Sequence, residues 1–164
     1  MKRVIIVRHA KAVPYGYEDD FNRKLRPSGK EDAEILSAEL KESGIAPDLI
    51  ISSPAKRAYS TAKVYAKTYG YDKKKIRKEE DLYDGLTTQD FIELLHDLPE
   101  DISSVFVFGH NPTIHYLINN LVRFFNSDTP TCSTAVIEFK VENWKNIASR
   151  EGDLVAHLKP RSFR

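Results

Sequence analysis

The chain of 164 residues has a single cysteine, Cys132, so it cannot form an intramolecular disulfide. A reducing compartment fits this composition, and we expect the protein to be cytoplasmic. We also expect Cys132 to be a small buried apolar residue rather than a nucleophile. No apolar run approaches the ~18 residues of a membrane-spanning helix, and the run at residues 4–7 is too short for a signal peptide. No cysteine and histidine cluster has the spacing of zinc ligands.

Excess charge of either sign is also lacking. The chain has 25 lysines and arginines against 24 aspartates and glutamates, a net charge of +1. This balance argues against a dedicated nucleic-acid-binding protein, which usually has a basic excess. Hydrophobic residues make up 41% and charged residues 30% of the sequence, as is ordinary for a soluble globular protein. Without internal repeats, low-complexity tracts or linkers, residues 1–164 are expected to form one domain.

Short apolar runs alternate with amphipathic stretches along the chain. This alternation predicts an α/β three-layer sandwich, with a mainly parallel central sheet and helices on both faces. The last two strands are close in sequence, so they are expected to pair as an antiparallel edge. Residues 10–27 and 124–133 are expected to be loops. The predicted strands are residues 4–7, 48–52, 76–78, 105–108, 135–141 and 154–158, and the predicted helices begin near residues 28, 55, 88 and 112.

Polar side chains stand where three of the predicted strands end. Arg8 and His9 follow the first strand, Ser53 ends the second, and His110 ends the fourth. Ligands in open α/β sheets bind at the carboxyl ends of the strands. We therefore expect these side chains to share one rim of the sheet.

This group of residue types suits phosphoryl transfer. Neutral imidazole is a competent nucleophile near pH 7, because its pKa is about 6.5, so His9 is the candidate for attack. Arg8 and Arg57 would bind the phosphoryl oxygens, and His110 could donate a hydrogen bond to them. Arg23, in the long loop, could close over the group. Any one of these residues alone is more often structural or solvated, so the indication comes from their joint placement.

Three segments resemble the histidine phosphatase superfamily and, within it, the short SixA-type phosphohistidine phosphatases. They are residues 5–12 (IIVRHAKA), 48–62 (DLIISSPAKRAYSTA) and 107–113 (VFGHNPT), which match in order and spacing. The resemblance covers most of the chain and weakens after about residue 125. It implies the histidine phosphatase (phosphoglycerate mutase-like) fold and no metal or organic cofactor.

The resemblance also implies roles for individual residues. His9 matches the histidine that becomes phosphorylated, Arg8 and Arg57 match the phosphate-binding arginines, and His110 matches the second pocket histidine. Residues 20–25 (DFNRKL) resemble a loop that contributes Arg23 to the pocket in the SixA-like group.

Two positions depart from the family pattern. Ala10 stands where the family usually has glycine, as it does in the SixA-like group. The proton donor of larger members is a glutamate after a Leu-X pair, and Asp84 is the nearest match here. Asp81 and Glu80 are competing candidates, and a site without a general acid stays open.

The uncertain acid bears on the substrate. An alkoxide leaving group normally needs general-acid help worth about 10²–10⁴-fold, whereas the imidazole of phosphohistidine is far less basic. We therefore expect a phosphatase that forms a covalent phosphohistidine on His9 and acts on a phosphorylated protein carrying phosphohistidine. One alternative is hydrolysis of a small phosphorylated metabolite, such as a sugar or nucleotide phosphate, with Asp84 as general acid. Another is a weakly catalytic module that binds phosphorylated partners. None of these hypotheses involves nucleic acid or a membrane.

Overall fold

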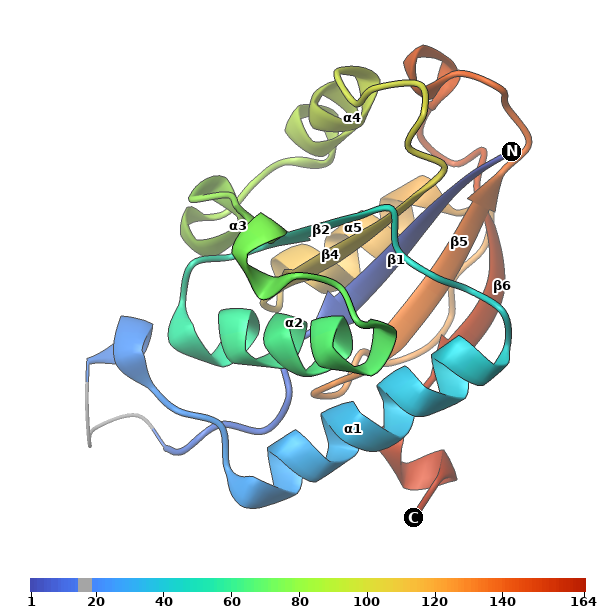
Figure 1. The fold of residues 1–164 in the computed structure, drawn as a ribbon. Coiled ribbons are helices and arrows are strands. Elements are labelled where there is room, and N and C mark those ends of the chain that lie inside the picture. The colour runs from blue at the N-terminus through green and yellow to red at the C-terminus, as the bar shows by residue number, and fades with distance from the viewer. Residues whose placement is uncertain (15–18) are drawn as a thin grey trace.

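The computed structural model describes residues 1–14 and 19–164, and a six-stranded mixed sheet lies at its centre (Figure 1). The strand order is β3-β2-β4-β1-β5-β6. The first four strands of this order run parallel to one another, whereas β5 is antiparallel to both β1 and β6. The predicted parallel sheet with an antiparallel edge is confirmed. The strands are β1 Lys2–Arg8, β2 Leu49–Ser52, β3 Arg77–Lys78, β4 Ser104–Gly109, β5 Thr134–Phe139 and β6 Asp153–Leu158.

Helices cover both faces of this sheet. Helices α1 (Pro27–Glu42) and α2 (Lys56–Tyr69) pack on one face, and α4 (Thr88–His96) and α5 (Thr113–Leu121) contribute to the core on the other. Side chains of a strand alternate between the faces, so a strand covered by helices on both faces is apolar at successive positions along its covered part. This explains the unbroken apolar runs of β1 and β4.

The two central strands supply both cores. Ile5 and Val7 of β1 pack with α1 and α2, while Val4 and Ile6 pack with α4 and α5. The side chains of β4 divide in the same way, and every residue of β4 is buried. Strand β1 pairs with β4 in parallel, with Arg8 opposite Gly109. The register therefore places the residues that follow these two strands side by side.

The structure adds elements that the sequence did not predict. Helix α3 (Asp81–Asp84) is a single turn, and a short 3-10 helix η1 (Asp20–Asn22) lies within the predicted loop of residues 10–27. Ala12 and Leu25 also form an antiparallel bridge across that loop. The part of this loop at residues 15–18 lies outside the described residues. Among the described residues, no helix combines the length and apolar character needed to cross a bilayer.

Candidate active site

The carboxyl ends of β1, β2 and β4 bring two histidines and a serine together. His9 follows β1, and its backbone N–H donates to the Gly109 carbonyl at 3.0 Å. The imidazole rings of His9 and His110 have their centroids 5.3 Å apart. His110 also makes a 2.8 Å hydrogen bond through Nε2 with Oγ of Ser53, which follows β2. Residues from three separate parts of the sequence therefore meet at one rim of the sheet.

A cavity of about 430 Å³ opens at this rim, and its lining is strongly basic. Five of its lining residues are arginine or lysine, and within the described parts of the chain no aspartate or glutamate lines it. Among the described residues, no cluster of histidine, cysteine, aspartate and glutamate could hold a metal ion. The cavity is thus suited to an anion. It is lined by Arg8, His9, Lys11, Ala12, Arg23, Arg26, Arg57, His110, Asn111 and Thr131.

His9 is held in one tautomer. Its Nδ1 lies 2.8 Å from the Ala10 carbonyl oxygen, which can only accept a hydrogen bond, so Nδ1 carries the proton. The lone pair of the neutral ring is then on Nε2. Burial, together with the charges of Arg57 and Arg8, lowers the pKa of His9 to about 4 against the opposing effect of the Ala10 hydrogen bond. At pH 7 the ring is therefore neutral and nucleophilic at Nε2.

Ala10, which departs from the glycine of the family pattern, is accommodated inside the fold. It is fully buried and belongs to the core between the sheet, α1 and α2. Its backbone N–H donates to Oγ1 of Thr61 on α2 at 3.0 Å. The methyl group therefore packs away from solvent, and the hydrogen bond fixes the backbone beside His9.

One ring nitrogen of His110 is hydrogen-bonded, and the other is buried and has no partner in the described part of the chain. Burial, together with His9 and Arg57, lowers the pKa of His110 to about 3, so the ring is neutral at pH 7. Oγ of Ser53 already accepts from the backbone N–H of Ala55 at 3.2 Å. If the Ser53 hydroxyl donates to Nε2 of His110, Nδ1–H of His110 is left as a donor. This Nδ1 has no hydrogen-bond partner among the described residues.

Each of the two predicted phosphate-binding arginines also has a buried nitrogen that lacks a hydrogen-bond partner among the described residues. These nitrogens are Nε of Arg8 and Nε of Arg57. A buried donor without a partner costs about 1–3 kcal/mol. Together with Nδ1 of His110, three such nitrogens belong to residues that line the same cavity as His9. A tetrahedral oxyanion bound in this cavity would bring acceptor oxygens close to these three residues.

Other groups of these arginines are anchored. Nη1 of Arg8 donates to the Thr129 carbonyl at 3.0 Å, and Thr129 is in turn held by Nδ2 of Asn111. Arg57, in the first turn of α2, donates from Nη1 to the Asp20 carbonyl at 2.7 Å and forms an ion pair with the Asp20 carboxylate at 3.1 Å. Both guanidinium groups are thus positioned before any ligand binds.

Asp20 is a site residue that the sequence did not single out. Its carboxylate pairs with Arg57 and Arg23 and accepts a 2.8 Å hydrogen bond from the Tyr83 hydroxyl. Burial alone would raise the pKa of Asp20, but the Tyr83 hydrogen bond and the two arginines outweigh this and lower the pKa. Asp20 is therefore ionised at neutral pH. The spacing of three residues between Asp20 and Arg23, which suits an ion pair, is the feature of the sequence that could have indicated this role.

The predicted loop arginine reaches the cavity, whereas the candidate acids do not line it. Arg23 lines the cavity and donates from Nη1 to the Val13 carbonyl at 3.1 Å. Asp84 is exposed on α3 and is not among the lining residues, nor are Asp81 and Glu80. Their neighbour Tyr83 faces the site instead, with its ring 5.6 Å from that of His110. The structure thus places no acid from α3 beside His9.

Comparison with known proteins identifies the family. The family model of the histidine phosphatase superfamily (branch 1) matches residues 4–102, which include His9 and Arg57. The chain belongs to the histidine phosphatase superfamily. The similar proteins include phosphatases, and together with the family membership they identify the protein as a phosphatase.

Similar proteins include a complete structural match and a partial sequence match. The SixA protein of Agrobacterium tumefaciens, assigned as a phosphohistidine phosphatase, is 27% identical with a TM-score of 0.80, over 97% of this chain and 98% of that one. The mitochondrial serine/threonine-protein phosphatase Pgam5 of Drosophila ananassae is 35% identical over 75 residues. That match spans 46% of this chain and only 26% of Pgam5.

Two further similarities cover nearly the whole chain. An uncharacterized protein of Mycobacterium leprae is 24% identical over 94% of this chain and 100% of its own length. A structure of the protein histidine phosphatase SixA in complex with tungstate has a TM-score of 0.83, at 20% identity and 99% coverage of both chains. The second similarity shows the shared fold, which is thus the fold of SixA-type histidine phosphatases.

Proposed function

We propose that the protein removes phosphoryl groups from phosphohistidine on other proteins, through a covalent intermediate on Nε2 of His9. The observation that carries the proposal is a set of three buried nitrogens, unpartnered among the described residues, on side chains that line one cavity with a neutral histidine. Nε of Arg8, Nε of Arg57 and Nδ1 of His110 would each donate to a phosphoryl oxygen. Such donors stabilise the charge of the transferring group in the transition state.

The reaction has two displacements. In the first, the lone pair on Nε2 of His9 forms a bond to phosphorus while the bond from phosphorus to the substrate imidazole breaks. The leaving imidazole takes up a proton from solvent. In the second, water attacks the phosphoryl group on His9, releasing inorganic phosphate and a proton and restoring the neutral ring. The fixed Nδ1 proton of His9 keeps Nε2 available at the start of each cycle.

The lining of the cavity favours a nitrogen leaving group over an alkoxide. Among the described residues, no aspartate or glutamate lines the cavity, and Asp20 at its edge is held in the ionised form. Neither arrangement supplies a ready proton to a poor leaving group. Imidazole, whose conjugate acid has a pKa of about 6.5, needs little such help. This supports phosphohistidine over a small phosphoester.

Replacing His9 tests the proposal. Wild-type protein should release phosphate from a phosphohistidine-bearing protein, and His9→Asn should lose the activity by roughly a thousandfold or more, because the nucleophile is gone. Brief incubation with labelled substrate should trap an alkali-stable, acid-labile phosphoenzyme in wild type only. His96→Asn is the matched control, since His96 bonds to the Ile147 carbonyl and does not line the cavity.

Two results would reject the proposal. Phosphate release that survives in His9→Asn would exclude the covalent intermediate. A higher kcat/KM for a sugar or nucleotide phosphate than for phosphohistidine, together with a strong loss in Asp84→Asn, would favour the phosphoester alternative.

A further inference from the structure

A second cavity beside the candidate active site is unusually rich in lysine. It has a volume of about 930 Å³ and lies along α2 and the start of α1. Seven of its lining residues are lysine or arginine, and none of the described residues that line it is aspartate or glutamate. We call it the lysine groove. Its lining residues are Lys24, Leu25, Arg26, Pro27, Lys30, Lys56, Ser60, Lys63, Val64, Lys67, Tyr71 and Lys73.

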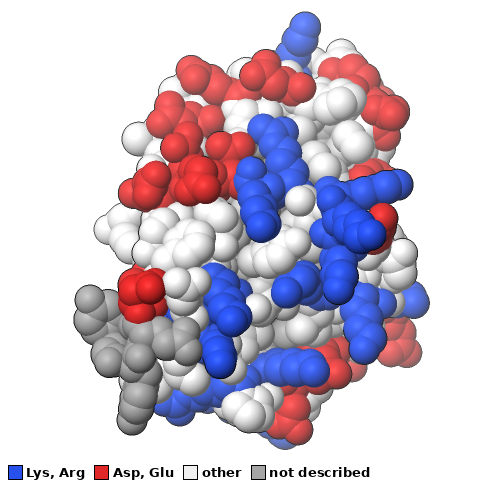
Figure 2. Space-filling model, turned by 60° about the vertical axis from the view of Figure 1, so that its left-hand side comes forward, with Lys and Arg blue, Asp and Glu red and all other residues white. Residues whose placement is uncertain are grey.

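The sequence of α2 accounts for one wall of the lysine groove. Lys56, Ser60, Lys63 and Lys67 recur at spacings of four, three and four residues, which places them in one stripe along the helix. The opposite side of α2 is buried against the sheet. Figure 2 shows basic side chains across the centre and right of the face it views, with acidic side chains gathered towards its upper edge.

The positive charge at four lysines of the groove is not neutralised by the residues that the structure describes. Among the described residues, no carboxylate forms an ion pair with Lys30, Lys56, Lys63 or Lys67. Lys63 instead lies over the ring of Tyr59, with its Nζ 5.0 Å from the ring centroid. In a chain of net charge +1, these four lysines form a local concentration of positive charge, which attracts an anionic partner.

The lysine groove also has an apolar side. Leu25, Val64 and Tyr71 line it between the basic residues, and the Tyr71 hydroxyl is already engaged with the backbone of Ile50 and Lys75. A small polyanion has no groups to place against such a surface. A protein segment that carries both acidic and apolar side chains has both, because protein interfaces combine an apolar centre with a charged rim.

The lysine groove adjoins the candidate active site. Arg26 lines both cavities, Arg23 lines the active site, and Lys24 and Leu25 line the groove. The short segment of residues 23–26 is therefore their common wall. A protein bound along the groove would have neighbouring residues at the entrance to His9.

We propose that the lysine groove binds an acidic and apolar surface segment of the phosphorylated protein, and so selects protein substrates for the His9 site. This inference rests on the proposed function and names the class of partner that the site takes. The charges would mainly raise the association rate and the preference for acidic substrates, as complementary charges do at protein interfaces.

Peptide binding measures the role of the lysine groove without requiring catalysis. Two fluorescent peptides with a central histidine are used, one flanked by glutamate and leucine and the other by glutamine and leucine. Wild type should bind the glutamate peptide about tenfold more tightly at low salt. The difference should shrink as sodium chloride is raised, because exposed charges are screened.

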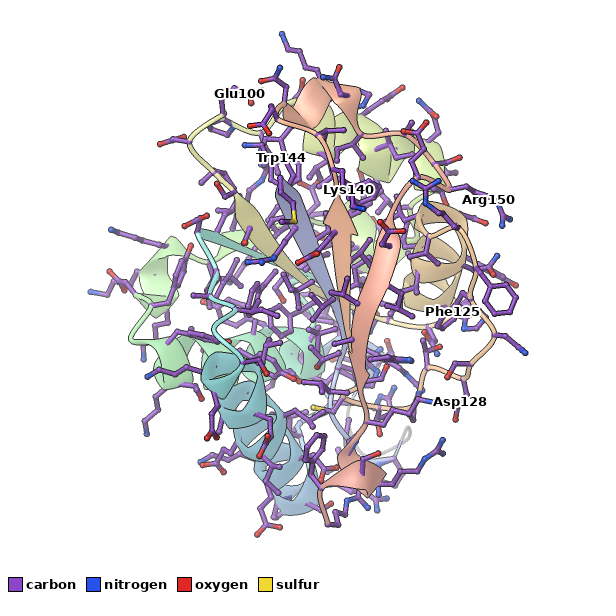
Figure 3. The ribbon with its side chains drawn as sticks, turned by 90° about the vertical axis from the view of Figure 1, so that its right-hand side faces the viewer. Glu100, Phe125, Asp128, Lys140, Trp144 and Arg150 are labelled. Atoms are coloured by element: carbon purple, nitrogen blue, oxygen red, sulfur yellow. The ribbon has the colours of Figure 1, made fainter. Side chains whose placement is uncertain are left out.

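Variants in which two groove lysines are replaced test whether their charges cause the preference for the glutamate peptide. Lys30→Glu combined with Lys67→Glu should abolish the preference for the glutamate peptide, and the same two positions changed to Gln should leave an intermediate preference. The control is Lys140→Glu combined with Lys145→Glu, which changes the net charge equally. Lys140 follows β5 at the opposite end of the sheet from His9 (Figure 3).

The outcomes separate this inference from the proposed function. The proposed role of the lysine groove would be rejected if wild type bound the two peptides equally. It would also be rejected if the groove variants and the control variant had the same preference for the glutamate peptide. A single-stranded oligonucleotide that binds the groove more tightly than the glutamate peptide would reject it as well. With phosphorylated peptides, hydrolysis of both at the same kcat/KM would support the proposed phosphatase function and reject substrate selection by the lysine groove. Selective binding without any hydrolysis would do the reverse.

Discussion

At the scale of single residues, Asp20 has two opposing effects on the active site. Its carboxylate holds Arg57 and Arg23 in place, which reduces the ordering cost of binding an anion. The same negative charge lies beside the guanidinium that would contact phosphate and repels a second anion. The balance decides whether Asp20 helps or hinders ligand binding.

Replacing Asp20 with asparagine should tighten the binding of inorganic phosphate. The amide can still accept from the Tyr83 hydroxyl, while the repulsive charge is removed, so the inhibition constant for phosphate should fall by roughly threefold to tenfold. Competitive inhibition measurements at constant ionic strength check this. Asp19→Asn is the control, because it makes the same charge change one residue away on an exposed side chain. Weaker phosphate binding in Asp20→Asn alone would show that positioning of the arginines outweighs repulsion.

At the scale of elements, the junction of α1 with the loop after His9 depends on a glycine. Gly29 packs so closely on Lys11 that a Cβ would lie 2.9 Å from its backbone nitrogen and nearer still to its carbonyl oxygen. Backbone atoms on both sides leave little room to adjust. Lys11 also accepts a hydrogen bond from the backbone N–H of Arg26, so this contact fixes the start of α1 against the active-site loop.

Gly29→Ala should therefore destabilise the protein although alanine favours helices. Overpacking of this kind typically costs about 1–3 kcal/mol, more than the ~1 kcal/mol gained from helix propensity. Urea unfolding measures the free-energy change. Ser28→Ala, at the neighbouring exposed position of the same helix, is the control and should change stability by less than about 0.5 kcal/mol. An unchanged or increased stability of Gly29→Ala would contradict the packing argument.

The elements that the sequence predicts well are those whose local pattern has one physical meaning. The apolar runs that became β1 and β4 are such elements, since a short, wholly apolar run is typical of a strand buried on both faces. Their ends placed His9 and His110 on one rim. Helix α3 and η1 were missed because single turns have no periodicity to detect.

The active site was predicted less completely, because some of its contacts join residues that are far apart in the sequence. Arg8, His9, Arg23, Arg57 and His110 all line the cavity that was expected at the strand ends. Asp20 and Tyr83 meet only through the tertiary fold, at a sequence separation of 63 residues, so no local pattern marks them. The lysine groove likewise needs α1 and α2 to be placed side by side before its charges form one surface.

At the scale of the whole molecule, three histidines are kept neutral by burial. Burial lowers the pKa of His9 and of His157 to about 4, and that of His110 to about 3. In the unfolded chain each has a pKa near 6.5. Between these values the unfolded state binds more protons than the folded state, so protonation favours unfolding.

The free energy of unfolding should therefore be greatest above about pH 6.5 and should fall as the pH drops towards 4. Urea unfolding across this pH range measures the slope. His157→Asn should make the slope shallower, because it removes one of the three groups, and His157 does not line the active site. A flat profile between pH 6.5 and 4 would contradict the burial of these rings.

The lone cysteine has a practical consequence for the folded protein. Cys132 is fully enclosed, its backbone N–H donates to the carbonyl of His9, and burial raises the pKa of its thiol to about 12. Alkylating reagents need the thiolate and access to it. In the native protein the thiol next to the His9 backbone should therefore not react with such reagents. The rate at which Cys132 is labelled would measure how often that region opens.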